Sequence, residues 1–203
     1  MVICVTGPMA AGKNHISSIL EKMTLDGKSF VSIDADLVCH EAVDDSAEKI
    51  IEAFGELAKK SGIPIADETG KIIRRNLGAL IFGKPELVAK QESIVYPQIT
   101  NKIKNYIEEN KNSNVIVNAT VLYKIPLMKE MDAVLFVDCP LPMRFLRARK
   151  RDSMKVAQIM ARFRSQGGLY SAYKKTGIPV VKIWNCGSGD LQKKLLTIIS
   201  RFR

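Results

Sequence analysis

Short apolar runs recur along the chain and are separated by polar, turn-forming segments. Five of them are rich in β-branched or aromatic residues and do not alternate with polar ones: Val2–Val5, Phe30–Ile33, Val115–Val117, Val134–Val137 and Pro179–Ile183. Strands that are covered by helices on both faces have this composition, because neither face meets water. The pattern therefore predicts five buried, parallel strands.

Segments with helical periodicity lie between these runs. They cover Lys13–Met23, Asp45–Phe54, Arg75–Phe82, Pro85–Asn110, Pro142–Arg151, Ser153–Ser165 and Asp190–Phe202. Strands that alternate with helices predict an α/β fold, because parallel strands need crossover connections. Roughly eighty residues separate the second run from the third, far more than one crossover needs, so we expect an inserted helical subdomain there.

The segment from Gly7 to Asn14 reads GPMAAGKN and fits the phosphate-loop pattern G-x-x-x-x-G-K. It follows the first predicted strand and precedes the first predicted helix, as this motif requires. Its glycines let backbone N–H groups turn toward phosphate oxygens, the helix N-terminus adds partial positive charge, and Lys13 adds a full charge. We prefer this interpretation to a glycine turn that fits by chance.

Asn14 stands where the motif usually carries a serine or threonine. The usual hydroxyl is a compact ligand of Mg²⁺. An amide oxygen can also bind the ion, but it lies one atom further out. The sequence therefore predicts a weaker or water-mediated magnesium contact at Asn14.

Two carboxylates, Asp34 and Asp36, follow the second predicted strand. In parallel sheets, ligands bind at the carboxyl ends of the strands. If the strand continues, both side chains point the same way, and one could activate a substrate hydroxyl while the other holds Mg²⁺ through water. A helix N-cap is an equally good interpretation of either residue.

Composition and charge narrow the class of protein. The chain has 203 residues, of which 46% are hydrophobic and 26% charged, which is typical of one globular domain, with or without an insertion, and excludes collagen-like and disordered chains. Its net charge is +10, which favours a polyanionic partner. The first 143 residues carry 16 basic and 19 acidic side chains, whereas the last sixty carry 15 basic and two acidic ones.

The basic excess begins in a predicted helix on which Arg144, Arg147 and Arg151 share one face. Arginines that close over a transferring phosphoryl group can accelerate the reaction by ~10³–10⁵ and exclude water. Most basic side chains here should simply face solvent, so we select Arg147 and Arg151 alone. The following Gly167-Gly168 could be a hinge or a helix C-cap.

Other residue types argue against several kinds of site. The four cysteines have no metal-binding or redox spacing, and the chain has two histidines, so we expect neither zinc nor a disulfide framework. We expect Trp184, at the end of an apolar run, to lie in the core. No run reaches the length of a membrane span, and the N-terminus has no basic leader, so we expect a cytoplasmic protein without membrane contacts.

A set of fragments, in their order and spacing, resembles the dephospho-CoA kinase family. The fragments are VTGPMAAGK, IDADLVCHE, Phe54-Gly55, Gly70 with Arg74-Arg75 and Leu77, Ile81-Phe82, Val137-Asp138, Arg147, Arg151-Asp152, Gln166, and Asn185-Cys186-Gly187-Ser188 with Asp190-Leu191. The resemblance covers nearly the whole chain. It implies that ATP, with Mg²⁺, phosphorylates the ribose 3′-hydroxyl of dephospho-coenzyme A, giving coenzyme A and ADP.

The resemblance also implies an architecture. A P-loop kinase core, with a five-stranded parallel sheet flanked by helices, would comprise residues 1–37, 113–143 and 176–203. A helical insertion at residues 38–112 would bind dephospho-CoA, and residues 144–175 would form a basic lid.

Roles for individual residues follow from the same resemblance. Asp36 would be the catalytic base, and Lys13, Arg147 and Arg151 would stabilise the transferring phosphoryl group. Residues that would bind the nucleotide are Gly7, Met9, Ala10, Ala11, Gly12, Lys13, Asn14, His15, Asn185 and Gly187. Residues that would bind the acceptor are Asp34, Asp36, Arg74 and Tyr96, and Asn14 would contact Mg²⁺.

Four departures from the family pattern leave room for another function. Besides Asn14, the chain has Tyr96-Pro97 for His-Pro, Ile73-Arg74 for Asp-Arg, and a segment ending in Lys124 for Pro-Leu-Leu-Phe-Glu. A divergent P-loop kinase with another acceptor, such as a nucleotide, or with weakened metal handling is therefore the alternative. A non-catalytic module that binds nucleic acid through the basic third has no motif to support it and ranks last.

Overall fold

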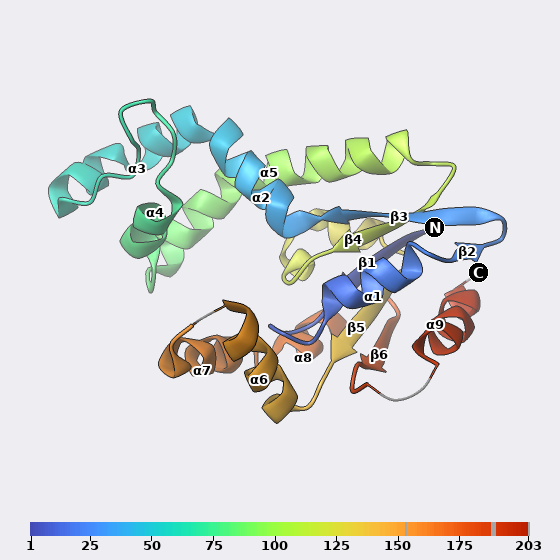
Figure 1. Cartoon of the computed structure of the whole chain (residues 1–203). Coiled ribbons are helices and arrows are strands. Elements are labelled where there is room, and N and C mark those ends of the chain that lie inside the picture. Colours follow the sequence, from blue (N-terminus) through green and yellow to red (C-terminus); the bar gives the residue numbers. More distant parts are fainter. Residues whose placement is uncertain (153, 188–189, 203) are drawn as a thin grey trace. The chain divides into compact units, whose positions relative to one another are not determined.

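The computed structural model describes residues 1–152, 154–187 and 190–202. Ser153, where we placed a helix start, and Ser188, part of the family resemblance, lie outside the described residues. The chain divides into two compact units, one comprising Met1–Ala35 with Tyr106–Arg203 and the other comprising Asp36–Asn105. Figure 1 labels the helices and strands of both units.

The first unit is built on one sheet of six strands in the order β2-β3-β4-β1-β5-β6 (Figure 1). The strands are β1 (Val2–Thr6), β2 (Thr24–Leu25), β3 (Lys28–Asp34), β4 (Asn114–Asn118), β5 (Ala133–Asp138) and β6 (Val180–Trp184). Strand β2 pairs antiparallel with β3, and the other neighbouring strands pair in parallel. The expected five-stranded parallel sheet is therefore corrected to a mixed sheet of six strands.

Strand β2, which we did not expect, is too short to give a periodic signal, but the turn that follows it is visible in the sequence. Asp26 and Gly27 join β2 to β3 with φ angles of 53° and 73°. Two successive residues with positive φ form the two-residue hairpin turn for which an Asp-Gly pair is suited. Leu25 then pairs with Lys28 across the turn. The turn chemistry, rather than the hydrophobic pattern, was the signal for this strand.

Alternate residues of the central strands face two apolar layers, as the period of a β-strand requires. On one face, Ile3 and Val5 belong to a buried cluster that also contains Ile16 of α1 (Lys13–Leu20) and Leu195 of α9 (Leu191–Ile199). On the other face, Phe136 packs edge-on against Tyr173, which is fully buried. The sheet is thus covered on both sides, and the loops at its carboxyl edge are held on a rigid base.

Further helical segments of the first unit follow β4, β5 and α9. They are the 3₁₀ turns Leu122–Lys124, Pro126–Glu130 and Ser200–Phe202, and the helices α6 (Leu141–Asp152), α7 (Val156–Ser165) and α8 (Leu169–Lys174). The sequence predicted α6 and α7 but missed α8, which spans only six residues and gives less than two turns of periodicity.

The second unit is helical. Its helices are α2 (Ala35–Asp45, whose first residue lies in the first unit), α3 (Ala47–Ser61), α4 (Arg74–Ile81) and α5 (Pro85–Glu109, whose residues from Tyr106 on lie in the first unit). Ile50, Phe54, Leu80 and Ile99 are buried in it. Where we expected one helix beginning at Asp45, α2 ends at that residue and α3 follows. The acidic and apolar residues of α2 gave no clear helical period.

Candidate active site

The loop between β1 and α1 is shaped by two glycines that no other residue could replace without strain. A Cβ atom on Gly7 would collide with the backbone carbonyl oxygen of Val137 in β5, and one on Gly12 would collide with the side-chain amide of Asn185. Gly12 also has a φ of 100°, a conformation that favours glycine. The loop therefore lies directly against the ends of β5 and β6.

The first turn of α1 presents backbone donors at the end of this loop. Gly12 occupies the N-cap position, and because it has no side chain, the first N–H groups of the helix receive no side-chain cap. The Lys13 ammonium folds back and donates to the carbonyl oxygen of Gly7 at 3.3 Å. Uncapped amides, a helix N-terminus and a lysine over the loop are a donor set that fits phosphate oxygens.

Arg147 and Asn185 join the loop to the segment after β6. The Asn185 backbone N–H donates to the Asp138 carbonyl at 2.8 Å, and its side-chain Nδ2 donates to the Ala11 carbonyl at 2.9 Å. From α6, Arg147 donates through Nη1 to the Ala11 carbonyl at 3.3 Å and through Nη2 to the Asn185 carbonyl at 3.1 Å. The structure thus brings Arg147 and Asn185, which the sequence selected, together at the Ala11 carbonyl of the loop.

Arg144, which we did not select, is a buried basic residue of α6. Its side chain is buried, stacks 4.4 Å from the Phe163 ring centre, and donates through Nε to the Met9 carbonyl at 3.0 Å. Burial lowers the pKa of its guanidinium. The Met9 N–H in turn donates to Gln166 Oε1 at 2.7 Å. Arg144 and Gln166 therefore hold the backbone C=O and N–H of Met9, respectively, which helical spacing alone could not indicate.

The basic helices pack on the phosphate loop through an apolar cluster. Met9 is buried against Ala148 of α6 and against Ile159 and Phe163 of α7. Ala10, which packs against this cluster, also lines a cavity of about 470 Å³ together with Gly12, Arg147, Lys150 and Arg151. Arg151 is exposed, so its charge borders solvent beside the loop. Two residues of the phosphate loop and three basic side chains line this cavity, so the cavity suits a negatively charged ligand.

Oxygen and amide groups gather on the sheet side of the loop. Asn14, exposed in the first turn of α1, accepts a hydrogen bond through Oδ1 from Asn118 Nδ2 at 2.9 Å. Asn118 ends β4 and pairs in register with Asp34, which ends β3. Amide and carboxylate oxygens are hard ligands of the kind that Mg²⁺ prefers. These side chains therefore fit a magnesium ion beside the phosphate loop.

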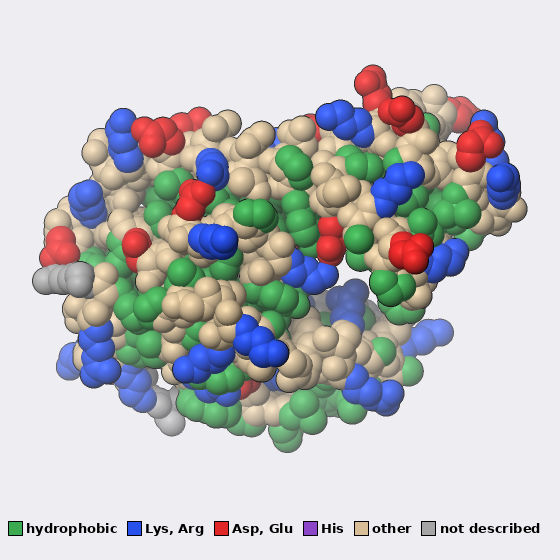
Figure 2. Space-filling model, turned by 180° about the vertical axis from the view of Figure 1, so that it is seen from behind, with side chains coloured by type: hydrophobic (Ala, Val, Ile, Leu, Met, Phe, Trp, Pro, Cys, Tyr) green, Lys and Arg blue, Asp and Glu red, His purple; other side chains and the backbone are tan. Residues whose placement is uncertain are grey.

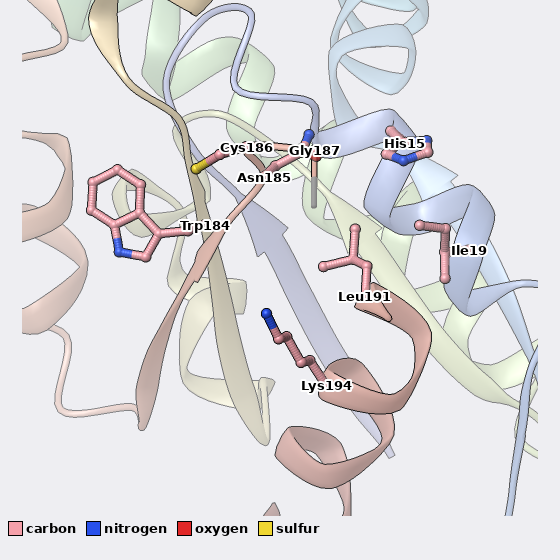
Figure 3. Close-up of a pocket in the computed structure, with 8 residues that line it drawn as sticks. All are labelled: His15, Ile19, Trp184, Asn185, Cys186, Gly187, Leu191 and Lys194. Carbon is pink, nitrogen blue, oxygen red and sulfur yellow. The ribbon is translucent and has the colours of Figure 1, made fainter. Parts of the chain in front are cut away.

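A second cavity, of about 410 Å³, lies beside the turn that follows β6 (Figure 3). It is lined by His15 and Ile19 of α1, Trp184 at the end of β6, the turn residues Asn185, Cys186 and Gly187, and Leu191 and Lys194 of α9. The apolar side chains of Ile19 and Leu191 lie next to polar groups from the turn, an arrangement that suits a flat heterocycle with polar edges.

Trp184 corrects one of our expectations. We placed it in the core, but the residue is 56% exposed. In Figure 3 its ring lies across the β6 ribbon from Ile19 and Leu191, and the residue lines the cavity from that side. Lys182, two residues earlier on the same face of the strand, lies 5.2 Å from the ring centre. Trp184 is the last residue of the edge strand β6 and is not covered, although the apolar run that it ends is typical of a buried strand.

A tyrosine that the sequence analysis missed holds the loop after β4. Tyr173 donates through its hydroxyl to the Thr120 carbonyl at 3.3 Å and accepts from the Leu122 N–H at 3.0 Å. Its burial raises the pKa of the phenol. Lys124, where the family pattern has a glutamate, follows this anchored segment and is exposed. A buried tyrosine in a short helix gave no sequence signal for this role.

The second unit carries three of the expected site residues. Asp36 is exposed and is the second residue of α2, so the N-cap interpretation does not apply to it. Arg74 donates through Nη1 to the Asp44 carboxylate at 3.0 and 3.1 Å. Tyr96 is half-buried on α5. Burial, followed by the negative charge of Asp36, raises the pKa of the nearby Cys39 thiol.

Comparison with known proteins gives a consistent family. Residues 1–176 match the family model described as dephospho-CoA kinase. A dephospho-CoA kinase of Treponema denticola is 31% identical over 208 residues, which cover 99% of this chain and 90% of that protein. The dephospho-CoA kinase of Treponema pallidum is 26% identical over 204 residues, covering 98% and 94%.

Solved structures share the fold. A crystal structure of a Thermus thermophilus protein gives a TM-score of 0.77 at 20% identity and covers 100% of this chain and 98% of that one. A Campylobacter jejuni dephospho-CoA kinase gives a TM-score of 0.57 at 23% identity, with 99% and 96% covered. In the part of the chain that the structure describes, no helix is long and apolar enough to cross a membrane.

Proposed function

The chain belongs to the dephospho-CoA kinase family and is a phosphotransferase, and we propose that it transfers the terminal phosphoryl group of ATP to the 3′-hydroxyl of dephospho-CoA. The observation that carries the proposal is the phosphate loop, whose glycines lie against β5 and Asn185 and whose helix begins without a side-chain cap. This geometry serves a polyphosphate.

The phosphate loop and the basic helices would bind and polarise the triphosphate. The amides between Gly7 and Asn14 would hold the phosphate oxygens, and Lys13 would follow the charge that develops as the phosphoryl group leaves. Arg147 and Arg151, on the proposed lid of residues 144–175, border the cavity over this loop. They would add charge stabilisation and keep water from accepting the phosphoryl group.

The base of the nucleotide would occupy the cavity beside the β6 turn. Asn185 and Gly187 belong to this turn, and His15 lies on α1, the helix that follows the phosphate loop. The base and the phosphates would therefore lie along one edge of α1. Magnesium, held by Asn14 and through water by Asp34, would neutralise phosphate charge when bound. The fit of these oxygens to a hard cation supports this assignment.

The acceptor would be bound by residues of the second unit and activated by Asp36. Its position matches the family's base, and its carboxylate is exposed on the first turn of α2. Arg74, which already faces Asp44, and Tyr96 would contribute to dephospho-CoA binding in the proposed domain of residues 38–112. A carboxylate that accepts the hydroxyl proton would make the 3′-oxygen a better nucleophile.

The assay that tests this function measures coenzyme A and ADP formed from ATP and dephospho-CoA over a range of Mg²⁺ concentrations. We expect coenzyme A and ADP in equal amounts. ADP release with a nucleoside or nucleotide acceptor, but no coenzyme A at any Mg²⁺ concentration, would instead support the divergent kinase that the changes at Ile73, Tyr96 and Lys124 leave open.

Cys186 offers a direct probe of nucleotide binding at the β6 turn. It is exposed and lines the cavity beside Asn185, whereas Cys4 is fully buried and burial raises its pKa to about 12. We expect a thiol reagent to modify Cys186 readily, ADP to slow that reaction several-fold, and Cys4 to stay unmodified. Peptide mapping by mass spectrometry measures each site.

The half-buried Cys39 in the second unit is the internal control, because it does not line this cavity. ADP should protect Cys186 much more than Cys39, and Cys186→Ser should abolish the protected signal. Equal modification of Cys186 with and without saturating ADP would place the base elsewhere.

A further inference from the structure

Asn118 is a buried polar residue at the carboxyl end of β4, next to the phosphate loop. It is 7% exposed, and its Nδ2 donates to Asn14 Oδ1 at 2.9 Å. Its own Oδ1 is buried without a hydrogen-bond partner among the described residues. A buried acceptor that lacks a partner destabilises the folded state, so Asn118 is not explained as a contribution to stability.

Asn114, at the other end of the same strand, shows the contrast. It is also buried, and its Nδ2 donates to the carbonyl oxygens of Leu25 at 3.4 Å and Lys28 at 3.2 Å. Asn114 therefore ties the β2–β3 hairpin to β4, which is a structural role. Asn118 instead donates to the exposed side chain of Asn14, at the end of the phosphate loop.

The bond between the two asparagines selects one orientation of Asn14. A carboxamide has one accepting and one donating end, and only the oxygen of Asn14 can accept from Asn118 Nδ2. The carbonyl oxygen has a second lone pair, which remains available. The longer arm of Asn14, compared with the usual serine or threonine, is thereby held against the sheet with its oxygen in a fixed place.

Resting on the proposed kinase function, we propose that Asn118 is a positioning residue that fixes the Asn14 oxygen as a ligand for the nucleotide-bound divalent cation. The pair of amides replaces the single hydroxyl that this position of a phosphate loop usually provides. Hydrogen-bond partners that orient metal ligands typically matter by about 10–100-fold in metal affinity. Asn118 acts through Asn14 and touches neither the phosphates nor the acceptor.

The test compares ADP binding with and without Mg²⁺, by calorimetry, in wild type and Asn118→Val. Wild type should bind ADP more tightly with Mg²⁺, and N118V should lose most of that gain, about 10-fold. Metal-free ADP affinity should be unchanged. The melting temperature of the free protein should stay the same or rise, since the unpaired Asn118 oxygen is removed.

Asn114→Val is the matched control, since it also replaces a buried asparagine of β4. N114V should lower the melting temperature, because two carbonyls of the hairpin lose their donor, and should keep the Mg²⁺ dependence of ADP binding. If N118V does not fold, N118A provides the same comparison. A Mg²⁺ gain that N118V retains in full, or that N114V loses equally, would overturn the proposal.

A double-mutant cycle separates positioning from a direct effect of Asn118. If Asn118 acts only through Asn14, the change N118V should have no further effect in a protein that already carries Asn14→Ala. Additive losses would overturn the proposal, as would a wild-type protein that binds ADP without any Mg²⁺ dependence. A wild-type protein that binds no ADP at all would instead contradict the proposed kinase function.

Discussion

Replacing Lys13 by alanine should lower kcat for coenzyme A formation by about 10²–10³-fold, the usual cost of removing one group that stabilises transition-state charge. Lys13 lies in the first turn of α1, and its ammonium already folds over the loop to the Gly7 carbonyl at 3.3 Å. The positive charge of Lys13 would stay close to the phosphoryl group during the transfer. The loss should therefore appear mainly in kcat and less in the apparent affinity for ATP.

Lys22→Ala is the matched control, because Lys22 is exposed just beyond the same helix and outside the loop. It should leave kcat within about twofold, since exposed charges distant from the site contribute little. Circular dichroism and the melting temperature would show that both variants are folded. A K13A enzyme with wild-type kcat would remove Lys13 from the chemistry.

Local sequence signals identified the parts of this molecule that are made by neighbouring residues. The phosphate loop has its glycines where a Cβ would collide with Val137 or Asn185, and each of the five apolar runs coincides with a strand. Such features depend on backbone conformation and on the burial of continuous apolar runs. The order of residues within a short segment indicates both directly. The hairpin strand β2 was missed because only its Asp-Gly turn carried a signal.

Residues that act through distant partners could not be found in this way. Arg144 and Gln166 bind the backbone C=O and N–H of Met9 from positions more than 130 residues along the chain, and Asn118 binds Asn14 across 104 residues. An arginine in a basic helix is expected in solvent, and an asparagine after an apolar run reads as a turn residue. Only the packing of α6, α7 and the sheet edge shows what each one holds.

The two carboxylates Asp34 and Asp36 were ambiguous in the sequence, and the structure places them in different elements. Asp34 ends the strand, half-buried and in register with Asn118, whereas Asp36 is exposed and lies within the first turn of α2. A negative charge in the first turn of a helix is favourable by itself. The helix position thus explains why an aspartate is tolerated at Asp36 but does not distinguish a base from a stabilising charge.

Asp36→Asn makes that distinction and should lower kcat by about 10²–10⁴-fold, the range for loss of a general base. Asparagine keeps the size of the side chain and its hydrogen-bonding oxygen but cannot take the proton of the 3′-hydroxyl. ADP affinity and the melting temperature should change little, because the side chain is exposed. Steady-state kinetics at saturating ATP and dephospho-CoA, with calorimetry for ADP, measure the two effects separately.

Asp34→Asn is the matched comparison for Asp36→Asn, because it separates the loss of a metal-binding group from the loss of a proton acceptor. If Asp34 serves the metal ion through water, its loss should raise the Mg²⁺ concentration needed for half-maximal activity, and excess Mg²⁺ should restore much of kcat. Excess Mg²⁺ should not rescue D36N, because the missing function is proton acceptance. Rescue of D36N by Mg²⁺, or an equal pattern in both variants, would assign Asp36 to the metal and leave proton transfer to another group or to solvent.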